Sequence, residues 1–243
     1  MMKLGAGVQL LPWDSEWLGF PVARLVTGAA GATQVIATTV VQCRAASIRL
    51  LYLLVDPADS AASAAAQTVG ASLVDVRQTY RLPFAVAASP VPLPPGIALT
   101  RATVLTPSLE ELAWQSGEHS RFRRDARIGD QAFRALYTRW LCQALAEGVV
   151  WVAATENEET AGMLAFESGD DGTASIALLA VAPMARRQRI GQYLVQTAAL
   201  EARHRGCTEL RVVTQGTNHP AWQLYEQCGF GLLRTEYCYH LWL

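Results

Sequence analysis

The chain has 243 residues, of which 51% are hydrophobic and 17% charged, and its formal net charge is -1. This balance is opposite to that of a disordered chain and predicts an ordered globular protein with one large core or two smaller ones. A nearly neutral chain lacks the field that holds nucleic acid or an anionic membrane surface, so neither is expected as a partner.

The N-terminus carries one positive charge and a short, broken apolar run, and the long apolar stretch at 28–44 is interrupted by threonine and glutamine. We expect neither a signal peptide nor a transmembrane helix, and therefore a cytoplasmic protein. The five cysteines form no CxxC pair, and the four histidines show no metal-ligand spacing. Free thiols and no metal are expected.

Residues 1–86 are expected to form a smaller N-terminal α/β unit. Leu50–Val55 is a continuous apolar run ended by Asp56 and Pro57, which is typical of a buried strand. The alanine-rich residues 59–69 predict a helix that ends at Gly70, and 72–82 predict a further strand. The proline-rich residues 87–95 are expected to be a linker between two domains.

The second domain is expected to span residues 96–243, with Thr106 and Asp130 as the capping residues of its first two helices. In chain order the patterns predict a strand at 97–103, a helix that opens at 106–110, a helix at 130–146, a hairpin of 149–154 with 161–167, a strand at 173–182, a helix at 190–205, a strand at 209–214, a helix at 218–228, and extended runs at 229–235 and 237–242. This order indicates a mixed α/β fold in which antiparallel strands precede a crossover helix.

A basic turn joins the apolar strand at 173–182 to the amphipathic helix that begins at Ile190. The first turn of that helix presents free amides, and Arg186, Arg187 and Arg189 add positive charge at the same place. Such a turn favours a pyrophosphate, and Gly191 lets a ligand approach the backbone closely. The alternative is a solvated basic turn before an ordinary amphipathic helix.

The turn resembles the acyl-CoA motif of the GNAT acetyltransferases, Arg/Gln-x-x-Gly-x-Gly/Ala. The chain matches it at Arg186 and Gly191 and departs from it at Arg189, where the family usually has glycine. The resemblance implies that backbone groups near Leu179 and Val181 pair with the pantetheine arm. The cofactor-binding residues that it implies are Leu179, Val181, Arg186, Arg187, Gln188, Arg189, Ile190, Gly191, Gln192 and Asn218.

A second segment matches the GNAT pattern Asn-x-x-Ala-x-x-Leu-Tyr-x-x-x-Gly-Phe. It consists of Asn218, Ala221, Leu224, Tyr225, Gly229 and Phe230. From its helical spacing alone, Tyr225 is better explained as a core aromatic residue than as a catalytic one. The resemblance implies that Tyr225 is the general acid that protonates the departing thiolate, after direct attack by a neutral amine on the thioester. A strand amide near Val181 would stabilise the oxyanion, and the base stays unassigned.

The resemblance therefore predicts an α/β GNAT fold with a mixed central sheet and splayed parallel strands, preceded by a partial GNAT-like unit. It implies an N-acetyltransferase that uses acetyl-CoA as cosubstrate and needs no metal. A homodimer remains open.

The acceptor is suggested by a narrower resemblance, to the TDP-fucosamine acetyltransferase group, at residues 11–20 and 120–122. It implies an amino-sugar nucleotide as acceptor, with Arg121 and Arg123 binding its diphosphate. The alternatives are a solvated loop for these arginines, a small amine or a protein N-terminus as acceptor, and a non-catalytic acyl-CoA-binding module.

Overall fold

A computed structural model of the protein describes residues 7–27, 32–84, 92–147, 149–169 and 171–243. The described residues fall into two compact units. The first is drawn from Met1–Arg77, Arg121–Ala132 and Thr235–Leu243, and the second from Gln78–Ser120 and Phe133–Arg234.

The two units are not consecutive along the chain, which differs from the expected division at residues 87–95. The difference arises because the C-terminal residues pair with strands of the first unit and because residues 121–132 pack there. Of the expected linker, residues 87–91 lie outside the described residues.

The first unit contains a mixed sheet with the strand order β1-β2-β3-β10-β4. Its elements are β1 (Val8–Leu10), α1 (Pro12–Leu18), β2 (Val22–Val26), α2 (Ala32–Ala45), β3 (Leu50–Val55), α3 (Ser60–Thr68), the start of β4 (Ser72–Pro83), α5 (Arg121–Arg124) and the end of β10 (Gly231–Trp242). β2 and β3 are parallel, whereas β1 with β2 and β3 with β10 are antiparallel.

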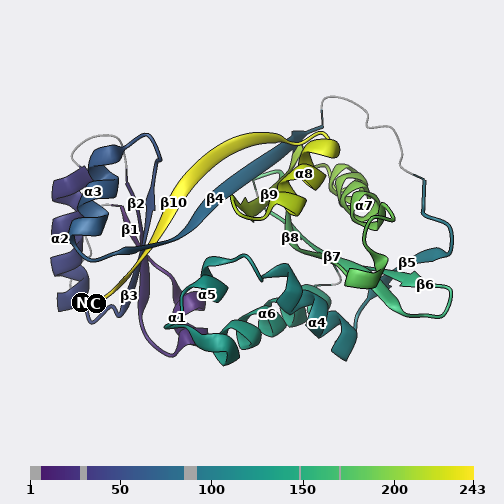
Figure 1. Cartoon of the computed structure of the whole chain (residues 1–243), viewed down its shortest axis with the longest axis horizontal. Coiled ribbons are helices and arrows are strands. Elements are labelled where there is room, and N and C mark those ends of the chain that lie inside the picture. The colour runs from purple at the N-terminus through teal and green to yellow at the C-terminus, as the bar shows by residue number, and fades with distance from the viewer. Residues whose placement is uncertain (1–6, 28–31, 85–91, 148, 170) are drawn as a thin grey trace. The chain divides into compact units, whose positions relative to one another are not determined.

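The core of the first unit lies between its sheet and the helices α2 and α3, which run side by side in Figure 1. Alternate residues of the strands supply it, including Leu51 and Leu53 of β3 and Tyr239 of β10. All six residues of β3 are buried, so the other face of this strand is covered as well. That is why the strand has a continuous apolar run and no alternation.

The second unit has the strand order β10-β4-β9-β8-β7-β6-β5. Its remaining elements are β5 (Ile97–Ala102), α4 (Pro107–Ser116), α6 (Gly129–Ala146, whose first turn belongs to the first unit), β6 (Val150–Thr155), β7 (Thr160–Ser168), β8 (Thr173–Val181), the 3-10 helix η1 (Pro183–Ala185), α7 (Ile190–His204), β9 (Glu209–Gln215) and α8 (His219–Gln227). Strands β5 to β8 are antiparallel neighbours, and β8 and β9 are parallel.

This order is the predicted one, with three differences. The short helices η1 and, in the first unit, α5 were not expected, and the two C-terminal extended runs form the single strand β10. The strand continues through Glu236 because its buried carboxylate is ion-paired with Arg77 at 2.6 Å. The predicted α/β fold with antiparallel strands before a crossover helix is confirmed.

Local capping chemistry sets several helix ends. The side chain of Thr106 accepts from the Leu109 amide at the start of α4, as expected, and that of Asp59 accepts from the Ala62 amide at the start of α3. Asp130 does not cap α6 as expected. It lies inside the first turn of α6, where its carboxylate pairs with Arg123.

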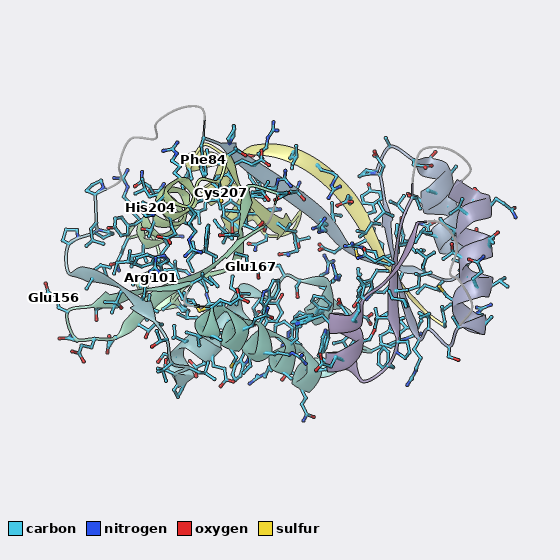
Figure 2. The ribbon with its side chains drawn as sticks, turned by 180° about the vertical axis from the view of Figure 1, so that it is seen from behind. Phe84, Arg101, Glu156, Glu167, His204 and Cys207 are labelled. Atoms are coloured by element: carbon cyan, nitrogen blue, oxygen red, sulfur yellow. The ribbon has the colours of Figure 1, made fainter. Side chains whose placement is uncertain are left out.

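Helices α4 and α7 cover the strands that form the centre of the second unit. Both contact β7 and β8, and Figure 1 shows them on opposite sides of these strands. The amide of Phe84 donates to the Thr208 carbonyl at 3.0 Å, which fixes the end of β4 near Cys207, just before β9 (Figure 2). Within the described ranges, no helix has the length and apolarity needed to cross a membrane.

Candidate active site

The parallel strands β8 and β9 separate partway along their length. Their pairing runs from Thr173 opposite Glu209 to Ile176 opposite Val212, and both strands continue beyond it. The separation begins beside a bulge, because β7 pairs Ala165 with Leu178 and Phe166 with Ile176, leaving one extra residue in β8. The predicted splay of the parallel strands is therefore confirmed.

Backbone groups of β8 point into this opening. The Ala182 amide donates to the Ala161 carbonyl of the β7 side at 2.9 Å, so Ala180 and Ala182 bond toward β7. In an antiparallel ladder the intervening residues direct their N–H and C=O groups the other way. Leu179 and Val181 therefore present their backbone toward β9, beyond the point where the β8–β9 pairing ends.

Two side chains bind the Val181 carbonyl oxygen. Nε2 of Gln115 donates to it at 3.0 Å, and Nε of Arg186 donates at 3.3 Å. A carbonyl oxygen has two lone pairs, so these bonds saturate it. The Val181 amide and both backbone groups of Leu179 are left facing the opening, where an extended amide chain could pair with them.

The basic turn has an unusual backbone. Arg187 has φ 62° and Arg189 has φ 63°, the left-handed conformation that favours glycine. Arg189 therefore adopts the backbone conformation that suits the glycine usually found at this position in the family. It occupies the N-cap of α7 without a side-chain cap, so the first amides of the helix, those of Ile190, Gly191 and Gln192, are available to a ligand.

These amides, the helix dipole and the exposed arginine side chains make the turn suited to an anion. Nε of Arg186 makes the bond to Val181, and within the described ranges no bond of its terminal nitrogens is found, so these can contact phosphate oxygens.

Helix α8 is held against this turn. A Cβ atom at Gly191 would lie 3.2 Å from Cδ2 of Leu224 and 3.7 Å from Cγ2 of Val181. Gln192 also donates to Gln227 of α8 at 3.0 Å. The structure thus gives Gly191 a packing role between helices, besides the expected close approach of a ligand.

Tyr225 is buried on α8, with its ring 5.7 Å from Phe230 and 6.3 Å from Tyr80. Burial, with a smaller contribution from Cys228, raises the pKa of its phenol well above the ordinary value, so the hydroxyl is protonated at neutral pH. No hydrogen bond to this hydroxyl is found in the described part of the chain. Asn218 caps α8, its side-chain oxygen accepting from the Ala221 amide at 3.3 Å.

The expected acceptor arginines belong to the first unit, whereas the residues above belong to the second. Arg121 is packed between aromatic rings, its guanidinium carbon 4.5 Å from the Tyr52 ring centre and 4.4 Å from that of Phe122. Arg123 is exposed and pairs with Asp130. The alternative of a merely solvated loop therefore does not describe Arg121.

A buried polar cluster in the first unit was missed by sequence reasoning. Oδ2 of Asp125 accepts from Nε1 of Trp242 at 2.9 Å and lies 2.6 Å from Nδ1 of His240. Burial opposes ionisation of Asp125, but these hydrogen bonds outweigh it and lower its pKa. Burial likewise lowers the pKa of His240, so the imidazole is neutral and its Nδ1–H donates to Asp125. The partners are 115 and 117 residues apart, and no local motif marks them.

Within the described residues, no group of three or more His, Cys, Asp or Glu side chains is arranged to hold a metal ion.

Comparisons with known proteins agree with this geometry. A model of the Acetyltransferase (GNAT) family matches residues 107–230, just over half of the chain. No curated protein matches. The solved structure of a GCN5-related N-acetyltransferase from Sphaerobacter thermophilus is 14% identical, with a TM-score of 0.66 over 97% of this chain and 76% of the other.

Two further solved structures share the fold. A GCN5-related N-acetyltransferase from Kribbella flavida is 14% identical, with a TM-score of 0.61 over 98% of this chain and 88% of the other. A glucosamine N-acetyltransferase region of a fungal multi-domain GH3 beta-N-acetylglucosaminidase is 15% identical, with a TM-score of 0.60 over 96% of this chain and 31% of the other.

The splayed parallel strands, the basic turn and the α8 motif define an acyl-CoA-dependent transferase of the GNAT fold. The chain belongs to the Acetyltransferase (GNAT) family and is an acyl-CoA-dependent N-acetyltransferase.

Proposed function

We propose that the protein transfers an acetyl group from acetyl-CoA to the primary amine of an amino-sugar nucleotide, with Tyr225 as general acid. The observation that carries the proposal is the opening between β8 and β9, which lies next to the turn that begins α7 and to α8. All of these elements lie within the second unit.

The residues fit the cosubstrate part by part. The two backbone groups of Leu179 suit the amides of the pantetheine arm, as a strand suits its neighbour, and the Val181 amide faces the same opening near the thioester end of the arm. The turn suits the pyrophosphate through its amides and charges, supplied by Arg186, Arg187, Gln188, Arg189, Ile190, Gly191 and Gln192. The side-chain oxygen of Asn218 caps α8, and no bond of its amide nitrogen is found in the part of the chain that the structure describes, so this nitrogen can contact CoA or an ordered water.

Acetyl transfer then needs one proton donor and one oxyanion contact. The lone pair of a neutral amine attacks the thioester carbonyl, and the Val181 N–H stabilises the negative oxygen that forms. When the intermediate collapses, the C–S bond breaks and Tyr225 gives its proton to the leaving thiolate. The nitrogen loses its own proton to water. Tyr225 is protonated at neutral pH, as this role requires, although burial, which raises its pKa, also makes the phenol a weaker acid.

The amino-sugar acceptor is supported by the sequence stretches at 11–20 and 120–122 and by the chemistry of the arginines. Arg121 and Arg123 would bind the diphosphate, for which Arg123 would exchange its Asp130 partner. A glucosamine N-acetyltransferase region shares the fold, so this fold accommodates an amino-sugar acceptor elsewhere.

Calorimetric titration with acetyl-CoA tests the cosubstrate site. Arg186→Glu should weaken binding by about 1.5–3 kcal/mol, the range for hydrogen bonds to charged groups. Arg44→Glu, the same change at an exposed residue of α2, should not weaken it. Acetyl-pantetheine, which lacks the pyrophosphate, should bind both variants equally. Unchanged affinity of Arg186→Glu for acetyl-CoA would remove the turn from the site.

A screen of acceptors, with detection of the free CoA thiol, tests the substrate class. Nucleotide-linked amino sugars should release CoA faster than small amines or peptides with a free N-terminus. Faster release with either of the latter would overturn the amino-sugar assignment. Binding of acetyl-CoA without release in any class would indicate a non-catalytic module.

A further inference from the structure

Gln115 is the one residue of α4 whose side chain is found bonded to the β8 backbone among the described residues. It is half-buried, and its Nε2 lies 3.0 Å from the carbonyl oxygen of Val181, 66 residues away. The Val181 peptide stands at the end of β8, where the strand has left β9. Nothing in the family motifs of this chain includes Gln115.

The residues on either side of Gln115 fix its position. Nε1 of Trp114 donates to the Thr138 hydroxyl of α6 at 3.0 Å. On the other side, Gly117 packs against the Tyr137 ring so closely that a Cβ atom at residue 117 would lie 2.2 Å from Cζ of that ring. Anchors on α6 at both sides leave the Gln115 amide little freedom to turn away from Val181.

The Val181 carbonyl is an acceptor that needs donors. Its position in the ladder turns it toward β9, yet no pairing with β9 reaches it. Left unbonded, its negative end would face the space where the thioester oxygen gains charge during acyl transfer, and like charges there raise the barrier. Gln115 and Arg186 together satisfy it and hold the peptide in one orientation.

We propose that Gln115 is a positioning residue for acetyl transfer: it holds the Val181 carbonyl in place and bonded, so that the Val181 N–H on the same strand edge, and not a free carbonyl, meets the thioester. The inference rests on the proposed function. It does not make Gln115 a catalytic residue, because Gln115 acts through the Val181 backbone. The donor is essential to this role, so neither leucine nor glutamate can replace glutamine.

The test compares Gln115→Leu and Gln115→Glu with the wild type, using single-turnover acetyl transfer and calorimetry with CoA. A misplaced peptide should slow transfer by about 10²-fold while CoA affinity is kept, because the turn that holds the pyrophosphate is intact. Gln143→Leu is the matched control, since Gln143 is exposed and its side-chain amide is found bonded, among the described residues, to Glu147 alone. It should react like the wild type.

A second readout does not depend on an acceptor. The infrared carbonyl band of bound [1-13C]acetyl-CoA reports hydrogen bonding to the thioester oxygen. It should move toward its position in water in both Gln115 variants and not in Gln143→Leu. Wild-type bands and rates in both variants would overturn the inference alone, as would a loss of CoA affinity as large as the loss of rate. Failure of the wild type to bind acetyl-CoA would overturn the proposed function as well.

Discussion

Leu224 occupies the space beside Gly191. Its Cδ2 would lie only 3.2 Å from a Cβ atom at residue 191, which is closer than side chains normally pack. The contact joins the first turn of α7 to α8, one residue before Tyr225. The same pair therefore couples the proposed pyrophosphate turn to the position of the proposed general acid.

Gly191→Ala should destabilise the protein by about 1–3 kcal/mol, the usual cost of adding a methyl group to a well-packed site. It should also slow acetyl transfer, because the added methyl group displaces α8. In a Leu224→Ala background the added methyl group finds room, and its cost should nearly vanish. Urea unfolding of the two single variants and the double variant measures this coupling. Additive free energies would show that Leu224 is not what requires glycine at residue 191.

Arg189→Gly should stabilise the protein by about 0.5–1 kcal/mol, because glycine adopts the φ of 63° without the penalty that an L side chain meets. Arg187→Gly, at φ 62°, should act in the same direction. Gln143→Gly, in the interior of α6, should instead destabilise by about 1 kcal/mol. Thermal melting of the three variants checks the signs, and a lower melting temperature for Arg189→Gly would refute the strain argument.

Local chemistry explains what could be predicted from the sequence. The caps at Thr106 and Asn218, the strand–turn–helix around Arg186 and the run of six apolar residues in β3 each depend on neighbours within a few residues. The order of elements in the second unit and the splay of β8 and β9 followed from these pieces together with the family pattern.

The parts that sequence reasoning missed depend on contacts between distant residues. Gln115 reaches Val181 across 66 residues, and Asp125 reaches His240 across 115. Neither pair forms a local motif that could be found in a single sequence. The division into units was missed for the same reason, because the end of β10 joins the first unit by pairing with β3.

Asp75→Asn should stabilise the protein in a pH-dependent way. Burial, partly offset by Arg121 and Arg124, raises the pKa of Asp75 to about 6 from 3.8, and its Oδ1 has no partner among the described residues. Because the folded state holds this proton more tightly than the unfolded state, stability is lost as pH rises from about 4 to 6 and stays lost above. The gain from the substitution should therefore be larger at pH 8 than at pH 4 by ~2–3 kcal/mol.

Asp56→Asn is the control for this pH series. Asp56 is exposed, and an asparagine oxygen can keep its bond to the Ala58 amide. Denaturant unfolding at several pH values should show no comparable trend for it. A gain from Asp75→Asn that is equal at pH 4 and pH 8 would mean that Asp75 ionises at no cost in the folded state.

Tyr225→Phe removes the proposed acid and keeps the ring. The ring contacts with Phe230 and Tyr80 do not involve the hydroxyl, so the melting temperature should hardly change. If the phenol protonates the leaving thiolate, single-turnover acetyl transfer should fall by about 10²–10⁴-fold, with acetyl-CoA affinity nearly kept. A tyrosine that serves only the core predicts near-normal transfer.

Tyr80→Phe makes the same deletion on the phenol whose ring lies 6.3 Å from Tyr225, so it shows whether the effect belongs to Tyr225. It should transfer acetyl groups at nearly the wild-type rate. Because burial raises the pKa of Tyr225, the phenol keeps its proton at pH 10.0, the ordinary pKa of a tyrosine. The wild-type rate of acetyl transfer should therefore not fall at that pH through loss of this proton. Wild-type transfer by Tyr225→Phe would leave thiolate departure to water or to another group, and the catalytic assignment would be wrong even with the fold unchanged.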